Sequence, residues 1–232
     1  MLDLKDHFIK ALEVEPNFSE AHLQLALLYQ EEGNHNNVTK HFDLAISSDI
    51  EEAEKMEDKG NELIKKFQFQ NAKEQFMKSQ EKKLHCSTVY LQQSIYFKGL
   101  NKIKLAQSAL ENCIKINPTH SAAHRDLGIL FANARQLDDA RLHLDRSIEI
   151  DYSDSMSHFH LGKVMILMQD FEDAEQHFLS AMDINPKFSD CMVEMAHLKL
   201  RMKQNQEAKE YYIKAKEITP ELKHAELEKI MG

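Results

Sequence analysis

The chain contains no tryptophan, and its 232 residues include only six glycines and four prolines. Turn-rich and β-rich proteins need more of both, because glycine and proline supply the backbone angles of tight turns. Their scarcity therefore favours a mostly helical chain with short connections. The hydrophobic content of 42% is enough for one large domain or for an extended array of repeats.

Cysteine and long apolar runs are also scarce. Cys86, Cys113 and Cys191 form no CxxC pair and are odd in number, so we expect reduced, buried thiols in a cytoplasmic protein. The first residues, MLDLKDHF, lack the basic-then-apolar pattern of a signal peptide. Apolar runs such as Val164–Met168 are too short to span a bilayer, so we expect no direct membrane insertion.

Positive charge is in deficit, with a formal net charge of −9 and a pI of about 5.8. An acidic surface has no electrostatic footprint for nucleic acid and is repelled by anionic membranes. The motifs GxxxxGK[ST], GxGxxG, GxSxG and HExxH are missing from the sequence. The many carboxylates recur at helical spacing, which is typical of the solvent-exposed faces of helices. We therefore expect no catalytic residue, no cofactor and no nucleic-acid partner.

All four prolines lie at multiples of one spacing. Pro16, Pro118, Pro186 and Pro220 are separated by 102, 68 and 34 residues, and a period of 34 is typical of stacked helix–turn–helix units. With proline at position 32 of each unit, six repeats fit without insertion or deletion. They span residues 19–52, 53–86, 87–120, 121–154, 155–188 and 189–222.

Small and large residues recur at fixed positions of these repeats. Small residues let two helices approach closely, and a bulky residue from the facing helix fills the remaining space. Position 8 is small and reads Ala26, Gly60, Ser94, Gly128, Gly162 and Ala196. Position 24 is large and reads Phe42, Phe76, Leu110, Leu144, Phe178 and Tyr212.

This register resembles the tetratricopeptide repeat family over residues 1 to about 222. The resemblance implies an all-α fold, a right-handed superhelical solenoid of antiparallel helix pairs. In each repeat, helix A would cover about positions 1–14 and helix B about positions 18–31. The A helices would line a concave groove. We expect one such solenoid over residues 1–232.

The second and third repeats depart from the pattern. Lys59 and Gln93 occupy position 7, where the other four repeats have leucine or methionine, and proline is replaced by Ile50, Leu84 and Tyr152 in three repeats. Stacking between neighbouring repeats loses apolar area where core positions are polar. We therefore expect residues 53–100 to be the least stable stretch.

The two ends fit incomplete repeats. Residues 1–18 match a helix B without its helix A, so we expect the chain to be a fragment of a longer protein. The uncovered face of Leu4, Phe8 and Ala11 predicts self-association. Residues 223–232 would form a capping helix, because Glu226 and Lys229 place polar groups at core positions.

Histidine is the one enriched residue type, with thirteen copies. Several share register positions: His22, His124 and His158 at position 4, and His7, His41, His143 and His177 at position 23. A ladder of metal or pH-sensing sites is one interpretation. Copies in successive repeats lie about 10 Å apart, too far to share one metal. We favour imidazoles that fill half-buried slots between helices and bond a polar neighbour, with no metal bound.

In the family, residues of helix A face the groove. At those positions this chain is largely apolar with an acidic rim, which suits an amphipathic segment with a basic flank. The Lys–Asn clamp of the chaperone-tail subtype and the asparagine ladder of the glycosyltransferase type are missing. The predicted partner-binding residues are Leu23, Leu27, Glu57, Asp58, Leu91, Ile95, Arg125, Ile129, Phe159, Lys163, Ile166, Val193 and Leu200.

The sequence thus predicts a protein–protein interaction scaffold without catalysis of its own. Its partner would be a protein or peptide that lays an apolar or amphipathic segment in the groove. One alternative is a targeting or regulatory arm of a larger enzyme. Another is a self-assembling structural module.

Overall fold

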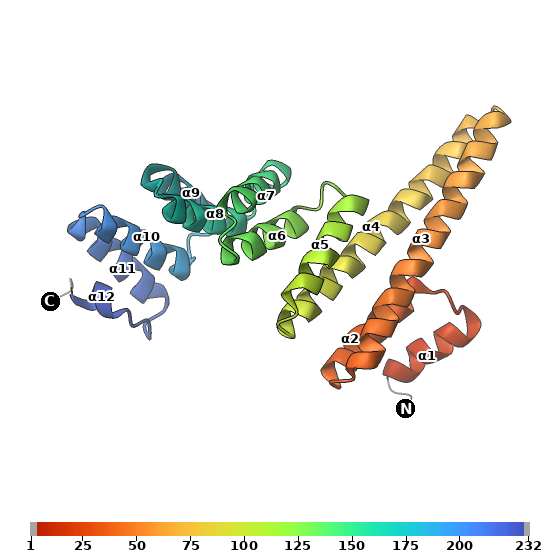
Figure 1. Cartoon of the computed structure of the whole chain (residues 1–232), viewed down its shortest axis with the longest axis horizontal. Coiled ribbons are helices and arrows are strands. Elements are labelled where there is room, and N and C mark those ends of the chain that lie inside the picture. The colour runs from red at the N-terminus through yellow and green to blue at the C-terminus, as the bar shows by residue number, and fades with distance from the viewer. Residues whose placement is uncertain (1–3, 230–232) are drawn as a thin grey trace. The chain divides into compact units, whose positions relative to one another are not determined.

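The computed structural model of the chain describes residues 4–229 and places twelve helices and no strand among them (Figure 1). They divide into two compact units, residues 1–120 and 121–232, and the division falls on a predicted repeat boundary. Unit 1 holds α1 (Leu4–Val14), α2 (Ser19–Glu31), α3 (His35–Lys65), α4 (Phe69–Gly99) and α5 (Ile103–Ile116). Unit 2 holds α6 (Ser121–Asn133), α7 (Leu137–Ile150), α8 (Ser155–Met168), α9 (Phe171–Ile184), α10 (Ser189–Arg201), α11 (Asn205–Ile218) and α12 (Ala225–Lys229).

Unit 2 follows the predicted register. Its helices pair as α6 with α7, α8 with α9 and α10 with α11, and each pair is one 34-residue repeat. The small residue at position 8 faces the large one at position 24. A Cβ added to Gly128 would lie 2.7 Å from Leu144 Cγ, and one added to Gly162 would lie 2.7 Å from a ring carbon of Phe178. The close approach of α6 to α7 and of α8 to α9 therefore depends on the missing side chain.

Unit 1 differs from the predicted helix boundaries. The predicted breaks near residues 50 and 84 are not there: α3 and α4 are continuous helices of 31 residues each. Each joins helix B of one repeat to helix A of the next, and the two pack against each other as an antiparallel hairpin. Their distal halves, residues 53–82, project beyond α1, α2 and α5 (Figure 1). We call this projecting segment the distal hairpin.

Turn chemistry explains which repeat boundaries survive. Tyr152 also replaces a proline, yet the chain turns there because Asp151 Oδ1 accepts a hydrogen bond from the Ser153 amide, at 3.0 Å. Asp154 then caps α8 by accepting from the Met156 amide, at 3.1 Å. At residue 84 neither a proline nor an Asx residue precedes the boundary. Asp49 has the right side chain, but it is buried among other partners, so α3 continues.

The continuous helices give Gln93 a partner. It is buried at position 7, where leucine or methionine fills the core of other repeats, and its amide donates a hydrogen bond to Asp43 Oδ1 of α3, at 3.2 Å. Lys59, the other polar residue at this position, is exposed on the distal hairpin. A polar side chain is therefore tolerated at each site, by a hydrogen bond in one case and by solvent in the other.

The distal hairpin leaves apolar side chains uncovered. Ile64 and Ile166 share register position 12, but Ile64 is 43% exposed on α3 whereas Ile166 is 9% exposed on α8. Met77 is 55% exposed on α4. The reason is geometric, because neighbouring repeats cover α8 on both sides while the two halves of the distal hairpin cover only each other.

The turns between paired helices all use the left-handed backbone region. The residue at position 15 has positive φ in each, and most are small, polar or flexible: Gly33, Asn101, Arg135, Gln169 and Lys203. Phe67 is the exception, with φ of 58° and an 80% exposed ring. An aromatic residue is unfavourable in this region, where glycine or asparagine avoids most of the steric cost.

The ends of the described chain carry short or loosely packed helices. In α1 no residue is buried, Leu4 is 58% exposed, and Phe8 and Ala11 are half-buried. The predicted capping helix begins at residue 225 and buries Leu227 completely, so it contributes an apolar side chain to the core of unit 2. The remainder of that prediction, residues 230–232, lies outside the described residues.

Glycine substitutions test the helix contacts of unit 2. In Gly128→Ala the new methyl group meets Leu144 and lies 3.0 Å from the backbone oxygen of Ala140, which cannot retreat. We expect a loss of about 1–3 kcal/mol in the free energy of unfolding, measured by urea denaturation. Gly99→Ala is the matched control, because nothing lies within 4 Å of its added Cβ. Equal effects of the two substitutions would contradict this packing.

The exposed distal hairpin narrows the stretch that we expect to be least stable, which the sequence placed at residues 53–100. Residues 87–97 bury Val89, Tyr96 and Phe97, so we expect the low stability to lie in residues 53–82. Native-state hydrogen exchange should show less protection of amides there than in residues 121–190. Equal or greater protection of the distal hairpin would refute this expectation.

Candidate functional site

The candidate site in unit 2 is the face formed by its A helices. Helices α6 and α8 lie side by side, as do α8 and α10. Between α6 and α8 the surface has a hollow of about 270 Å³, whose lining includes Ile129, His160, Lys163 and Leu167. Two of these, Ile129 and Lys163, are predicted partner-binding residues. We call this region the A-helix face of unit 2.

The predicted residues of unit 2 differ in how far a partner can reach them. Lys163 is exposed, and Arg125, Ile129 and Leu200 are half-buried. The other three are mostly covered by the repeats themselves: Phe159 is 7%, Ile166 9% and Val193 5% exposed. Phe159 packs against Phe178 and Phe188 at ring-centroid distances of 6.1 and 4.9 Å.

Ion pairs hold the charged residues of this face. The Arg125 guanidinium donates to Asp154 Oδ2 at 2.8 Å, and Lys163 Nζ lies 3.3 Å from Glu194 Oε1 of the next repeat. Burial raises the pKa of the Asp154 carboxyl, but hydrogen bonds from Ser157 and Arg125 outweigh it and hold that pKa below its usual value. Arg125 therefore has a carboxylate partner at the end of its own repeat, and Lys163 has one in the next repeat.

The six predicted residues of unit 1 lie on three helices. Leu23 is buried in α2, Leu27 and Leu91 are half-buried, and Ile95 and Asp58 are exposed. Glu57 accepts hydrogen bonds from Lys83 Nζ at 2.5 Å and Ser79 Oγ at 3.1 Å, and the bond from Lys83 lowers its pKa. Glu57 also lines a hollow of about 430 Å³ with residues that include Ile50, Cys86, Tyr90 and Ile116.

The register histidines form pairs, which the sequence interpretation missed. In each of three repeats the imidazole at position 4 meets the one at position 23, and the Nδ1–Nδ1 distances are 2.9 Å for His22–His41, 3.0 Å for His124–His143 and 3.4 Å for His158–His177. One ring nitrogen donates and the other accepts, so each pair is a hydrogen bond between helix A and helix B. The signal was available, because the two positions recur within the same repeat.

Burial favours the neutral form of four of the paired imidazoles. It lowers the pKa of His41 to about 4, and proximity to His22 and Lys40 acts in the same direction. Burial also lowers the pKa of His22, His158 and His177. A second proton on either ring would remove the acceptor of the pair, so the interhelical hydrogen bond requires the neutral state.

A charged cluster joins α2, α3 and α4 at the midpoint of the long helices. His85 lies between two carboxylates, with Nδ1 2.5 Å from Asp49 Oδ2 and Nε2 2.8 Å from Glu20 Oε2. The bond to Asp49 raises the pKa of His85 against the effect of burial. Asp49 is 1% exposed, and its second oxygen lies 3.8 Å from Lys82 Nζ. These contacts engage Asp49 where an Asx turn would otherwise form.

Within residues 4–229 no three histidine, cysteine or acidic side chains are grouped to hold a metal ion. All three cysteines are buried thiols, and burial raises the pKa of each to about 12, so the reactive thiolate is scarce at neutral pH. In the same part of the chain, no helix has the length and apolar character needed to cross a bilayer.

The histidine pairs predict that acid weakens the fold. Unfolded histidine titrates near pH 6.5, whereas folded His41 titrates near 4, so protons bind the unfolded chain first as the pH falls between these values. His85 acts in the opposite sense, but four paired histidines outnumber it. Urea denaturation at pH 7.5 and pH 5 should show a loss of at least about 1 kcal/mol.

A His41→Gln variant provides the control for this titration. Glutamine cannot take up a proton, so the variant should lose less stability on acidification than the unmodified chain. Stability that is constant or higher at pH 5 would contradict the role assigned to the pairs.

A family profile described as tetratricopeptide repeat matches residues 87–120 and 189–222. These are the boundaries predicted for the third and sixth repeats from proline spacing. No curated protein sequence matches the chain.

Solved structures share the fold at low sequence identity. MamA from Desulfovibrio magneticus RS-1 is 15% identical, with 75% of this chain and 98% of that one covered and a TM-score of 0.54. PilF from Pseudomonas aeruginosa is 14% identical, and the match covers 92% of this chain and 96% of PilF with a TM-score of 0.54. A chain of the APC/C hetero-tetramer Cut9–Hcn1 is 12% identical, with a TM-score of 0.59. The match covers 99% of the present chain and 46% of the chain in that complex.

The profile match, the 34-residue register and the paired helices agree. The fold is an all-α tetratricopeptide solenoid of the kind that serves as a protein-interaction scaffold, and residues 87–120 and 189–222 match the tetratricopeptide repeat profile.

Proposed function

We propose that the A-helix face of unit 2 binds an apolar or amphipathic segment of a partner protein. The observation that carries this proposal is the hollow between α6 and α8, where Ile129 and Leu167 stand beside Lys163. Leu167 is 41% exposed, so an apolar side chain of a partner can reach it. A hollow of this size accommodates one or two such side chains rather than a whole small-molecule ligand.

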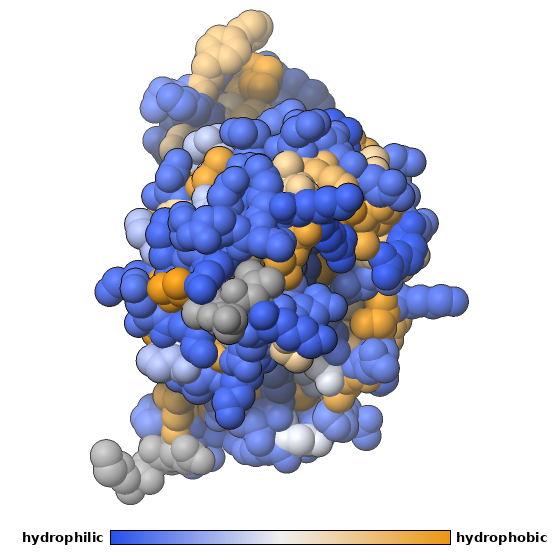
Figure 2. Space-filling view, turned by 90° about the vertical axis from the view of Figure 1, so that its left-hand side faces the viewer, coloured by the Kyte–Doolittle hydropathy of each residue, from blue (hydrophilic) through white to orange (hydrophobic). Residues whose placement is uncertain are grey.

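Charge sets the flanks of the partner. The charged residues that line the hollow itself, Arg135 and Lys163, are basic, but Lys163 Nζ lies 3.3 Å from Glu194 of α10 and the chain as a whole carries a net charge of −9. A segment with basic residues beyond its apolar anchors would gain from the acidic surface around the hollow and would associate faster at low salt. Figure 2 looks onto α9–α12 of unit 2 and shows mostly hydrophilic surface with apolar side chains in small, separate groups.

The unit 1 residues of the predicted groove and the N-terminal helix are secondary candidates. Ile95 is 43% exposed on α4 and can serve as an anchor there. Self-association through α1 is favoured by Leu4, which is 58% exposed on a helix with no buried residue. An N-terminal arm of this kind would place two copies of the chain together rather than recruit a different protein.

Peptide selection tests the A-helix face. We expect random peptides displayed on phage and selected on the whole chain to include apolar sequences with basic flanks. The Leu167→Glu variant should weaken their binding at least tenfold, because a carboxylate would enter the apolar hollow. Fluorescence anisotropy with the selected peptides measures the change.

Leu142→Glu is the matched control, since Leu142 is a 65% exposed leucine on α7 outside the hollow. Its peptide binding should equal that of the unmodified chain. Loss in both variants, or in neither, would refute the A-helix face as the binding site.

A further inference from the structure

The tip of the distal hairpin combines three features that the scaffold does not need. Phe67 occupies the left-handed turn position, is 80% exposed, and meets the 62% exposed Phe69 edge to face at 6.3 Å. Both rings lie in water at the end of two long helices. A residue that costs stability and buries nothing at its own site is unexplained by folding.

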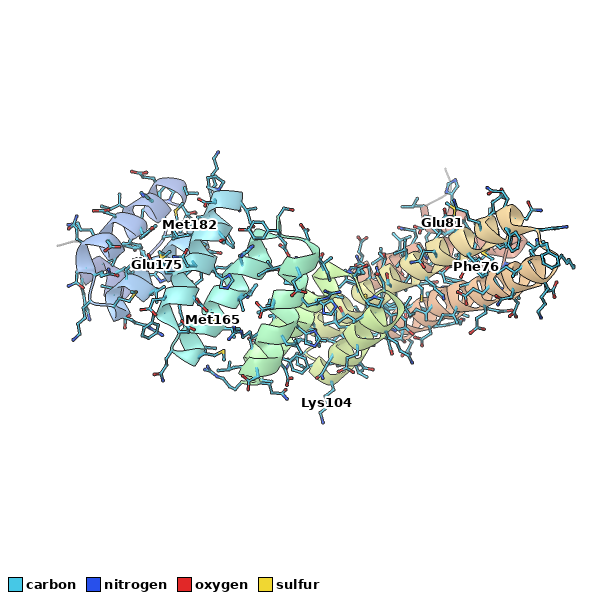
Figure 3. All side chains as sticks on the ribbon, turned by 90° about the horizontal axis from the view of Figure 1, so that it is seen from above. Phe76, Glu81, Lys104, Met165, Glu175 and Met182 are labelled. Atoms are coloured by element: carbon cyan, nitrogen blue, oxygen red, sulfur yellow. The ribbon has the colours of Figure 1, made fainter. Side chains whose placement is uncertain are left out.

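Beside the tip, the side of the distal hairpin has an apolar hollow of about 400 Å³. Ile64 of α3 and Phe69, Ala72, Phe76 and Met77 of α4 supply its apolar lining, with Lys73 and Gln80 at its edge. Phe76, labelled in Figure 3, also faces α3, where it would touch a Cβ added to Gly60 at 2.8 Å. The floor of the hollow is therefore fixed by the packing of the two helices.

The charge around the tip is opposite to that of the chain. Residues 62–74, ELIKKFQFQNAKE, contain three exposed lysines and two exposed glutamates, so the tip has a small positive net charge whereas the whole chain carries −9. Lys65 and Lys66 precede the turn, and Lys73 lines the hollow. The pattern is an apolar depression with basic groups on its rim.

We propose that the tip of the distal hairpin is a second docking surface, for an acidic amphipathic segment of a partner protein. Its apolar side chains would enter the hollow against Ile64 and Met77, Phe67 and Phe69 would close over it, and its carboxylates would pair with Lys65, Lys66 and Lys73. This charge preference is opposite to that of the A-helix face, so the two surfaces select different partners.

Two other occupants fit the same observations less well. An anionic bilayer would engage the convex tip and its lysines but would leave the hollow on the side of the hairpin unfilled. A second copy pairing symmetrically through this surface would bring two sets of three lysines together, which is repulsive. Both occupants are distinguishable outcomes of the test.

The test uses the whole chain and a displayed library of random peptides. We expect selection to yield a group of acidic peptides with apolar residues at helical spacing. Phe67→Asn and Met77→Glu should each weaken the binding of these peptides at least tenfold, measured by fluorescence anisotropy. Lys66→Glu should also weaken their binding, and it should raise the affinity for versions of the peptides in which lysine replaces the acidic residues. Leu105→Glu, at a 47% exposed leucine of α5, and Leu167→Glu on unit 2 should leave them unchanged.

Phe67→Asn separates binding from folding. Asn101 occupies the same turn position with φ of 56°, so asparagine suits the backbone and the variant should melt at the same or a higher temperature than the unmodified chain. Lost peptide binding with retained melting temperature supports the proposal.

Three results would overturn it. The first is selection that yields no acidic peptide sensitive to Phe67→Asn. The second is sedimentation with phosphatidylserine vesicles that Phe67→Asn abolishes, in the absence of such peptides, which would assign the tip to a membrane surface. The third is a concentration-dependent increase in mass, seen by light scattering and removed by Phe67→Asn, which would assign it to a second copy.

Discussion

The structure depends on how closely the two helices of each repeat can approach. A residue without a bulky side chain at position 8 lets a phenylalanine or leucine at position 24 lie against the opposite backbone, as Gly162 does for Phe178. The same contact occurs in both units, between Gly60 and Phe76 and between Gly128 and Leu144. Every other contact between the helices, including the histidine hydrogen bonds, is possible only because this one sets the distance between their axes.

What varies along the chain is how one repeat is joined to the next. Where Asn117, Asp151 or Asn185 begins the connection, its side chain accepts from the amide two residues later and the chain turns. Where the connecting residues are compatible with helix, as at residue 84, the helix continues and its distal half projects from the unit. The same repeat pattern thus produces stacked pairs in unit 2 and a projecting hairpin in unit 1.

The sequence predicted the repeats well because small and large residues alternate at a constant spacing, and both matched segments begin where the proline register placed them. It did not predict the long helices, because that outcome depends on whether Asp49 bonds the local backbone or a histidine 36 residues away. It also did not distinguish anchors that a partner can reach, such as Ile129, from Phe159 and Val193, which neighbouring repeats cover. Register gives the face of a helix, whereas exposure depends on what the next repeat places against it.

The unbroken helices also have a mechanical consequence. A helix of 31 residues is about 46 Å long and contains no turn that could act as a hinge. The two rods are joined near their midpoint by Asp49 and His85 and at the near end by the hydrogen bond between His35 and Tyr96, at 2.8 Å. A load applied at Phe67 therefore acts through a lever arm of about 25 Å, measured along α3 from Asp49. It reaches the body of unit 1 through the packing of α3 against α2 and of α4 against α5, rather than being absorbed within a flexible loop.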